Sequence, residues 1–243
     1  MYSIYKKEIN AFFSSLIAYI VIAVFLVMTG LFMWVFNDTS ILMYNYATLD
    51  QLFAIAPMIF LFLIPAITMR AFAEENQKGT IEFLATKPIS DLDIVLGKYF
   101  ANVTLVLFAL LPTLLYYYSV HQLGSPPGNL DSGGILGSYI GLIFLASAFV
   151  AIGMWTSSLT DSQIVAFILG SFVCFVVHWS FDFIADLGLF AGEAGAIVSK
   201  LGIAHHYDSI SRGVLDSRDV LYFLSVIAVF ILATLTSLSK RKW

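Results

Sequence analysis

Six long stretches of the sequence contain almost only apolar residues, and each is long enough to cross a lipid bilayer as a helix. A spanning helix needs about 20 largely apolar residues, and within lipid only helices and closed barrels satisfy all backbone hydrogen bonds. The stretches are continuously apolar and lack the alternation of barrel strands. The sequence therefore predicts an all-α integral membrane protein, a single domain over residues 1–243, with transmembrane helices at residues 12–36, 52–70, 98–120, 135–160, 162–181 and 220–239.

The composition agrees with this fold class and excludes others. Hydrophobic residues make up 60% of the chain and charged residues only 12%, whereas soluble domains carry about 25% charged residues. The small net charge of -4 does not indicate a nucleic-acid partner. The single cysteine, Cys174, excludes an internal disulfide and a cysteine-based zinc site. Adjacent His205 and His206 would point apart on a helix with no third ligand at suitable spacing, so we expect no metal site.

The distribution of lysine and arginine predicts the orientation. With six crossings, both termini lie on one side, together with the connection after the second span. That side carries 9 of the 12 Lys and Arg residues, whereas the loops at 37–51 and 121–134 carry none. Because cytoplasmic loops are enriched in Lys and Arg, we expect both termini in the cytoplasm of a multi-pass protein.

The N-terminal residues 1–11 have an amphipathic pattern. Tyr2, Tyr5, Ile9 and Phe12 recur at helical spacing, and the charged residues fall on other faces. This favours a helix that lies in the membrane interface before the first span. A frayed terminus is the alternative.

Residues 71–97 form the longest predicted cytoplasmic connection. An acidic pair, Glu74 and Glu75, follows the membrane, and a later Pro88 predicts a break between two short helices. Ser90 resembles the N-cap of the second. Two antiparallel spans need only a few residues between them. The length and patterning therefore favour contact with a cytoplasmic partner, with a solvated charged loop as the alternative.

Residues 182–219 form a second unusual connection, on the predicted outer side. Its first part is too short and too rich in glycine to span, which favours a re-entrant or interfacial pair of short helices. Just before it, His178 and Asp182 lie four residues apart on one helical face. They could form an outer gate or proton relay, or a helix-terminal pair at the headgroups beside the interfacial Trp179.

Small residues and prolines within the spans bear on packing. Gly137 and Gly141 form a G-x-x-x-G spacing, which lets helices approach closely within the bundle or between subunits. Pro57, Pro65 and Pro112 lie inside the second and third spans. Each can kink its helix, either as a hinge or as a static packing feature.

No catalytic motif is present in the sequence. It contains neither H-E-x-x-H nor G-x-S-x-G. The nearest approach to a phosphate-binding loop is Gly97-Lys98, but Leu92 replaces the first glycine and Tyr99 replaces the final Ser or Thr. We therefore expect no catalysis by this chain.

The segment AFAEENQKGTIEFLATKPISDLDIVLGKYF resembles the loop between the second and third spans of ABC-2 type transporter permeases. Family-like positions are an acidic pair, Gly-Thr, an acidic residue, an apolar pair, and a Pro before a short helix that ends in Gly-Lys. Here these are Glu74, Glu75, Gly79, Thr80, Glu82, Phe83, Leu84, Pro88, Gly97 and Lys98, and Lys87 lies in the same predicted coupling segment. The whole chain is also similar to the permeases of the gliding-motility-associated ABC transporter of gliding bacteria.

The resemblance implies a type V exporter-like fold and a mechanism. A separate cytoplasmic ABC ATPase would bind ATP and Mg, and residues 74–88 would form the coupling helix that seats on it. The permease would be a homodimer in the bacterial inner membrane. An auxiliary subunit with a large outer-side domain is a further expected partner. ATP hydrolysis would drive transport or mechanical work.

Two alternatives remain at this point. One is a secondary transporter driven by protons through His178 and Asp182. The other is a mechanical module that moves an outer partner and passes nothing across the membrane. The near absence of charge within the spans favours the latter, or a hydrophobic substrate, over ion transport.

Overall fold

A computed structural model describes the chain except for residues 45, 81–88, 187–192 and 241–243, and every regular element in the described part is helical. The prediction of an all-α protein is therefore confirmed. The elements are α1 (Tyr2–Phe13), α2 (Leu16–Trp34), α3 (Ile41–Tyr44), α4 (Asp50–Thr68), α5 (Arg70–Gln77), α7 (Asp91–Leu110), η1 (Leu111–Thr113), α8 (Leu114–Leu123), α9 (Ser132–Ser158), α10 (Gln163–Asp186), α11 (Glu193–Ser199), α12 (Ile203–Ser211) and α13 (Ser217–Lys240).

Six helical stretches among the described residues are long and apolar enough to cross a membrane, as the sequence predicts. They are Leu16–Trp34, Asp50–Gln77, Asp91–Leu123, Ser132–Ser158, Gln163–Ala185 and Ser217–Lys240. The second continues through α5 to Gln77, and the third already begins at Asp91, so polar residues extend both beyond the apolar runs that the sequence marks.

The predicted connection at 71–97 is consequently more helical than its sequence indicates. Residues 70–77 form α5, directly after α4, and α7 already begins at Asp91. Ser90 caps α7 as predicted, because its hydroxyl accepts a hydrogen bond from the Asp93 N–H at 3.2 Å. The predicted second short helix, which enters the third span, is one helix with it, because residues 91–97 belong to α7.

The prolines have different structural effects. Pro57 and Pro65 lie within α4, which remains one helix. Pro112 lies in η1, the 3₁₀ turn between α7 and α8. Since proline lacks an N–H, a local change of helix type is the expected response.

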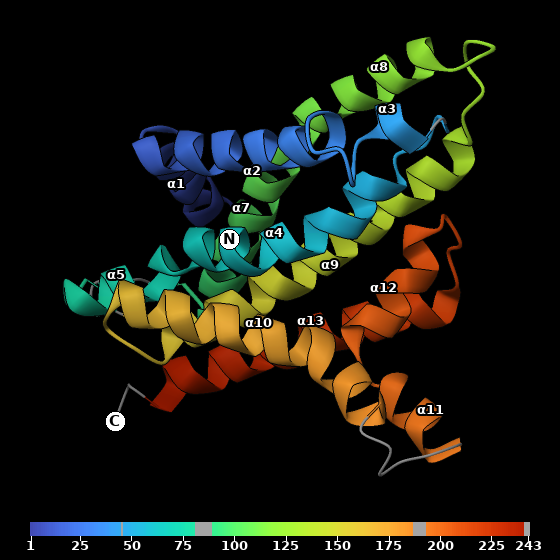
Figure 1. Cartoon of the computed structure of the whole chain (residues 1–243). Coiled ribbons are helices and arrows are strands. Elements are labelled where there is room, and N and C mark those ends of the chain that lie inside the picture. The colour runs from blue at the N-terminus through green and yellow to red at the C-terminus, as the bar shows by residue number, and fades with distance from the viewer. Residues whose placement is uncertain (45, 81–88, 187–192, 241–243) are drawn as a thin grey trace.

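Helix α9 lies at the centre of the bundle (Figure 1). It contacts α4, α5, α7, α10, α12 and α13, and 67% of its most apolar stretch is buried. The corresponding buried share is only 11% for α13. The outer helices therefore present broad apolar faces, which suit lipid or another protein in the membrane.

The two ends of the bundle differ in what they carry. One end, which we call the α5 end, holds α5, the start of α7 and the C-terminal end of α13 (Figure 1). The opposite end, which we call the α12 end, holds α8, α11 and α12. The predicted outer connection thus contains two short helices in its described part. His206 fastens α12 to α13, with Nδ1 at 2.7 Å from Oδ1 of Asp219.

Candidate functional site

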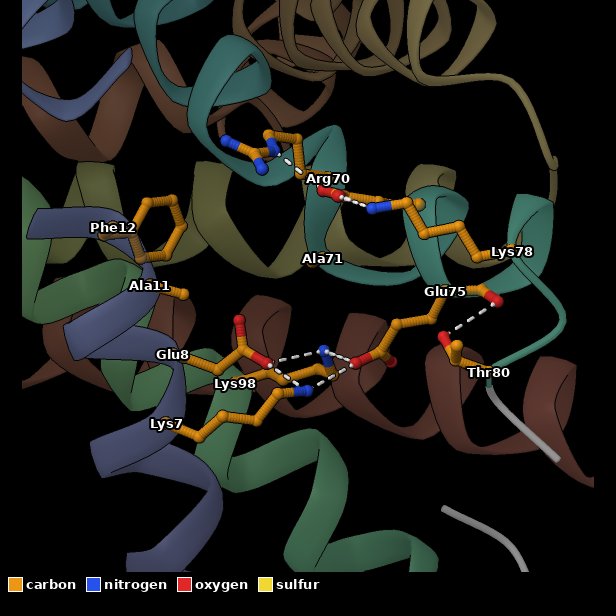
Figure 2. A pocket seen from close by; sticks show the side chains of 11 residues that line it. Lys7, Glu8, Ala11, Phe12, Arg70, Ala71, Glu75, Lys78, Thr80 and Lys98 are labelled. Atoms are coloured by element: carbon orange, nitrogen blue, oxygen red, sulfur yellow. Dashed lines mark hydrogen bonds and ion pairs between the residues drawn. The ribbon is translucent and has the colours of Figure 1, made fainter. Parts of the chain in front are cut away.

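A cluster of charged side chains joins three helices at the α5 end (Figure 2). Lys98 of α7 lies between two carboxylates, with its Nζ at 2.9 Å from Oε1 of Glu8 in α1 and 3.0 Å from Oε1 of Glu75 in α5. Lys7 of α1 lies 3.0 Å from the same Glu75 oxygen. Helices that are far apart in sequence are therefore held together by shared ion pairs.

Lys98 is the centre of this cluster. Its side chain is only 2% exposed, and its ammonium lies 5.3 Å from the centroid of the Phe72 ring. A buried ammonium is stable only when it is paired with opposite charge. The ammonium of Lys98 is paired in this way. The carboxylates of Glu8 and Glu75 balance its charge, and the face of the Phe72 ring attracts it as well.

Gly97, the residue before Lys98, explains how α1 comes close enough. A Cβ at this position would lie 3.0 Å from both the Ile4 Cβ and the Met1 carbonyl oxygen. Only glycine leaves room for that approach without movement of α1. The Gly97-Lys98 pair therefore has a structural role. Gly97 allows α1 to pack closely against α7, and Lys98 forms an ion pair with Glu8 of α1.

Lys7 is the more exposed cation of the cluster. Partial burial disfavours its charged form, but the hydrogen bond and negative charge of Glu75, with a contribution from Glu8, outweigh burial and raise the pKa of Lys7. Lys7 therefore stays charged at neutral pH. Two ammonium groups share the Oε1 atom of Glu75, while its buried Oε2 atom has no hydrogen-bond partner in the described chain.

Glu74 has different partners from its neighbour. Its Oε2 accepts a hydrogen bond from Nε of Arg70 at 2.8 Å, and its Oε1 accepts one from Nζ of Lys78 at 2.6 Å. Both cations lie four residues away, Arg70 at the start of α5 and Lys78 at its C-cap. Glu74 therefore stabilises its own helix, whereas Glu75 links α5 to α1 and α7.

Helix α5 is fixed to the end of α9 by one hydroxyl. Oγ of Ser157 accepts hydrogen bonds from the N–H groups of Phe72 and Ala73, at 3.0 and 3.1 Å. The same hydroxyl donates to the Met69 carbonyl at 2.9 Å. The first N–H groups of a helix lack partners within it, and here a side chain of another helix supplies one.

A tight turn ends α5. Gly79 adopts a positive φ of 65°, a conformation that glycine tolerates best. The Thr80 N–H donates to the Glu75 carbonyl at 2.9 Å. The turn leads into residues 81–88, so the predicted partner contacts at Glu82, Phe83, Leu84, Lys87 and Pro88 lie outside the described residues.

A cavity of about 330 Å³ adjoins the charged cluster. Lys7, Glu75, Lys98 and Thr80 are among the side chains that line it (Figure 2). The cavity lies between α1 and α5, so its shape depends on the ion pairs that hold these helices. Movement of α5 against α1 would change it.

At the α12 end, the predicted pair His178 and Asp182 lines a second cavity, of about 680 Å³. His178 is buried and its ring meets Phe149 edge-on, with the centroids 5.8 Å apart. Asp182 is half-buried. The structure thus brings both residues to one cavity.

The glycines of the G-x-x-x-G spacing lie against α12 and the turn after it. A Cβ on Gly137 would lie 2.7 Å from the Gly213 carbonyl oxygen, and one on Gly141 would lie 2.5 Å from Cγ2 of Ile210. Oγ of Ser138 donates to the Ser211 carbonyl at 2.7 Å. This close approach lies within one chain.

Comparison with known proteins assigns the family. A model of the ABC-2 family transporter proteins matches residues 36–185, which is more than half of the chain. The chain belongs to the ABC-2 transporter family. No curated protein matches it. The matched region includes α4, α5, α7 and α9, and therefore the Glu75–Lys98 pair.

As an ABC-2 protein, the chain is a membrane-spanning permease subunit of an ABC transporter. Permeases of this family act with an ATPase that resides in a separate subunit.

Several residues of this ABC-2 permease site are not evident from sequence. Lys7, Glu8 and Ser157 belong to no motif, and only contacts between helices reveal them. Lys7 and Ser157 contact α5, and Glu8 contacts Lys98 of α7. Lys98 is already among the family-like positions, and its place gives a physical reason as well, because a lysine in the first turns of an apolar helix needs a nearby anion.

Proposed function

We propose that the α5 end receives the ATPase and passes its movement to the transmembrane helices. The observation that supports this most directly is the position of Lys98, which joins α1, α5 and α7 through Glu8 and Glu75. A force on α5 would therefore reach α1 and α7, because the separation of buried ion pairs costs much free energy.

In this proposal, residues 74–88 act together as the coupling segment. Lys78 and the Gly79–Thr80 turn are exposed on the side from which residues 81–88 continue. The ATPase would contact that continuation, including Glu82 to Pro88. Glu75 would act behind the contact and hold α5 to the bundle, while the ATPase binds ATP and Mg.

The orientation and location also belong to the proposal. Described basic side chains at the α5 end include Lys7, Arg70, Lys78, Lys98 and Lys240. Because lysine and arginine favour the cytoplasmic side, the α5 end and both termini would lie in the cytoplasm, with the protein in a bacterial inner membrane.

The wider assembly follows the same proposal. Two copies would form a homodimer through the apolar faces that the bundle leaves exposed. An auxiliary subunit with a large outer-side domain would meet the α12 end. ATP hydrolysis would then drive transport, or mechanical work on an outer partner, in a gliding motility system.

The proposal is tested by reconstituting the permease with its co-purified ATPase and measuring ATP turnover with and without the permease. Glu75→Gln keeps the size of the side chain but removes the negative charge shared by Lys7 and Lys98. We expect the permease-dependent change in ATP turnover to fall about tenfold, which corresponds to about 1.4 kcal/mol. Glu74→Gln is the comparison variant within the same segment, and we expect a smaller fall, because its partners Arg70 and Lys78 lie on α5 and at its C-cap.

Equal turnover for both variants and the unchanged protein would contradict the proposal, provided that both remain folded by size-exclusion chromatography. Absence of any ATPase from the native complex would contradict it more broadly. In that case uptake driven by a pH gradient through His178 and Asp182 becomes the alternative to measure.

A further inference from the structure

His206 lies where α12 meets α13 and the turn of residues 200–202, which we call the α11–α12 turn. Its Nδ1 atom is 2.7 Å from Oδ1 of Asp219 in the first turn of α13. Its Nε2 atom is 2.8 Å from the carbonyl oxygen of Lys200 in the α11–α12 turn. Each ring nitrogen therefore faces an oxygen of a different segment.

These two contacts together require a proton on both ring nitrogens. A carbonyl oxygen only accepts hydrogen bonds, so the Nε2 atom must supply the hydrogen in its contact with Lys200. A neutral ring then has no hydrogen on Nδ1, and the Nδ1 lone pair would face the Asp219 carboxylate. The imidazolium form carries an N–H on each nitrogen and satisfies both acceptors. The geometry around His206 therefore fits the protonated ring.

The side chains next to the ring also suit a positive charge. Asp219 is buried, and a buried carboxylate needs a paired cation. The ring of Tyr222 stacks on that of His206, with the centroids 3.9 Å apart, and aromatic faces attract cations. The exposed ring of His205 meets that of His206 edge-on at 5.5 Å, and it opposes the charge when it is itself protonated.

The other charged groups of the packed segments lie away from the ring. Helix α9 has no acidic, basic or histidine side chain. The side chains of Lys200 and Arg218 are exposed. Further titratable groups of α4, α10 and α12 line the cavity of about 680 Å³, which His206 does not line; they are Asp50, His178, Asp182, Tyr207 and Asp208. Asp219 is therefore the acidic partner of His206 in the described chain.

The contacts of His206 hold the α11–α12 turn rather than the whole of α12. The hydroxyl of Tyr222 donates to the Leu201 carbonyl at 2.6 Å, so the two stacked rings together join this turn to α13. The far end of α12 is held separately by α9, because Oγ of Ser138 donates to the Ser211 carbonyl at 2.7 Å. Loss of the His206 contacts would therefore act on the turn alone.

We propose that His206 is a pH-sensitive switch that joins the α11–α12 turn to α13 when its ring is protonated. Loss of the proton as the pH rises removes one of the two hydrogen bonds and leaves the buried Asp219 carboxylate unpaired, so the turn separates from α13. Histidine ordinarily changes charge between about pH 5 and pH 8, whereas the ordinary pKa values of aspartate, tyrosine, lysine and arginine lie outside that range.

Hydrogen–deuterium exchange of the full chain in nanodiscs tests this switch. The protection of the amides of residues 201–207 is compared at about pH 5.5 and about pH 8, after correction for the intrinsic exchange rate at each pH. We expect protection to fall about tenfold at the higher pH, because a hydrogen bond to a charged group is lost. Peptides from α9 serve as the reference and should keep their protection.

Variants then assign the response to one ring. His206→Gln has a side chain that cannot be protonated, so residues 201–207 should show the low protection at both pH values. Asp219→Asn removes the paired charge and should lower protection at about pH 5.5. His205→Gln is the matched control, because it removes an exposed ring one residue away and leaves both contacts of His206 in place. It should keep the tenfold response of about the same size as the wild type.

Equal protection of residues 201–207 in the wild-type protein at both pH values would overturn the proposal. An unchanged pH response in His206→Gln would overturn it as well. So would loss of the response in His205→Gln, which would assign the titration to the neighbouring ring. These measurements involve no ATPase, so their outcome is independent of the function proposed for the α5 end.

Discussion

The two ends of the bundle use charge in opposite ways. At the α5 end, Lys98 and its neighbours neutralise one another across three helices. At the α12 end, carboxylates surround a larger cavity, and Asp50 and Asp208 lack salt bridges to other described residues. Shared ion pairs fix three helices to each other at the α5 end, whereas the pair of His206 and Asp219 joins only α12 to α13. The first arrangement suits force transmission and the second suits a local change of contact.

The largest expected effect comes from the centre of the α5 end. Lys98→Met removes the buried ammonium and leaves Glu8 and Glu75 with Lys7 alone. Loss of one partner from a buried ion pair costs about 3–5 kcal/mol of folding free energy. Thermal unfolding of the purified protein in detergent would measure the loss as a lower midpoint.

Lys78→Met is the matched control for that variant. Lys78 also pairs with a glutamate, but its side chain is 61% exposed. An exposed pair contributes less than about 1 kcal/mol. Similar losses in the two lysine variants would contradict the conclusion that the buried ion pairs of Lys98 hold α1, α5 and α7 together.

A smaller effect is expected where α9 meets the turn after α12. Gly137→Ala would place a Cβ 2.7 Å from the Gly213 carbonyl oxygen, and Gly213 has a positive φ of 83°. Because backbone atoms cannot rotate away, we expect a loss of about 1–3 kcal/mol from overpacking, measured by the same unfolding assay. Gly133→Ala is the control, since its Cβ would meet only Oδ1 of Asp131, at 3.5 Å. Equal stability of the two variants would contradict the close approach of α9 and α12.

The smallest effect concerns one hydrogen bond at the α12 end. Tyr207→Phe removes the bond from its hydroxyl to the Phe53 carbonyl, with an expected loss of about 1 kcal/mol. Tyr118→Phe is the control, because Tyr118 is exposed.

The difference in stability between the wild-type protein and Tyr207→Phe should also depend on pH. Burial raises the pKa of Tyr207 above the ordinary value for tyrosine. The stabilisation from the protonated phenol is therefore complete below the unfolded-state pKa of about 10 and declines as the pH rises toward the folded-state pKa. Equal unfolding curves for wild type and Tyr207→Phe at neutral pH would contradict the hydrogen bond.

Hydropathy and helix signals were sufficient to predict much of the fold. The six apolar runs, the Ser90 cap and the two short helices before the last span follow from local pattern and agree with the described structure. The extent of α5 did not follow. Its polar residues are helical in a setting of tertiary partners, such as the Ser157 hydroxyl at the start of α5.

The site was predictable only in part, for the same reason. The acidic pair drew attention from its sequence, but the sequence could not separate Glu74, whose partners are on its own helix, from Glu75, whose partners are on α1 and α7. The cavity around His178 was equally hidden. Asp50 and Asp208 join it from segments more than a hundred residues apart, and periodicity carries no information about such distances.

The central claim is that the α5 end docks the ATPase. A photoreactive residue placed at Lys78, at the exposed end of α5, tests it in native membranes, with the exposed Leu215 beyond α12 as the matched position. We expect a cross-link to the ATPase subunit from position 78 and none from position 215. No cross-link from position 78, or an ATPase cross-link from position 215, would contradict it.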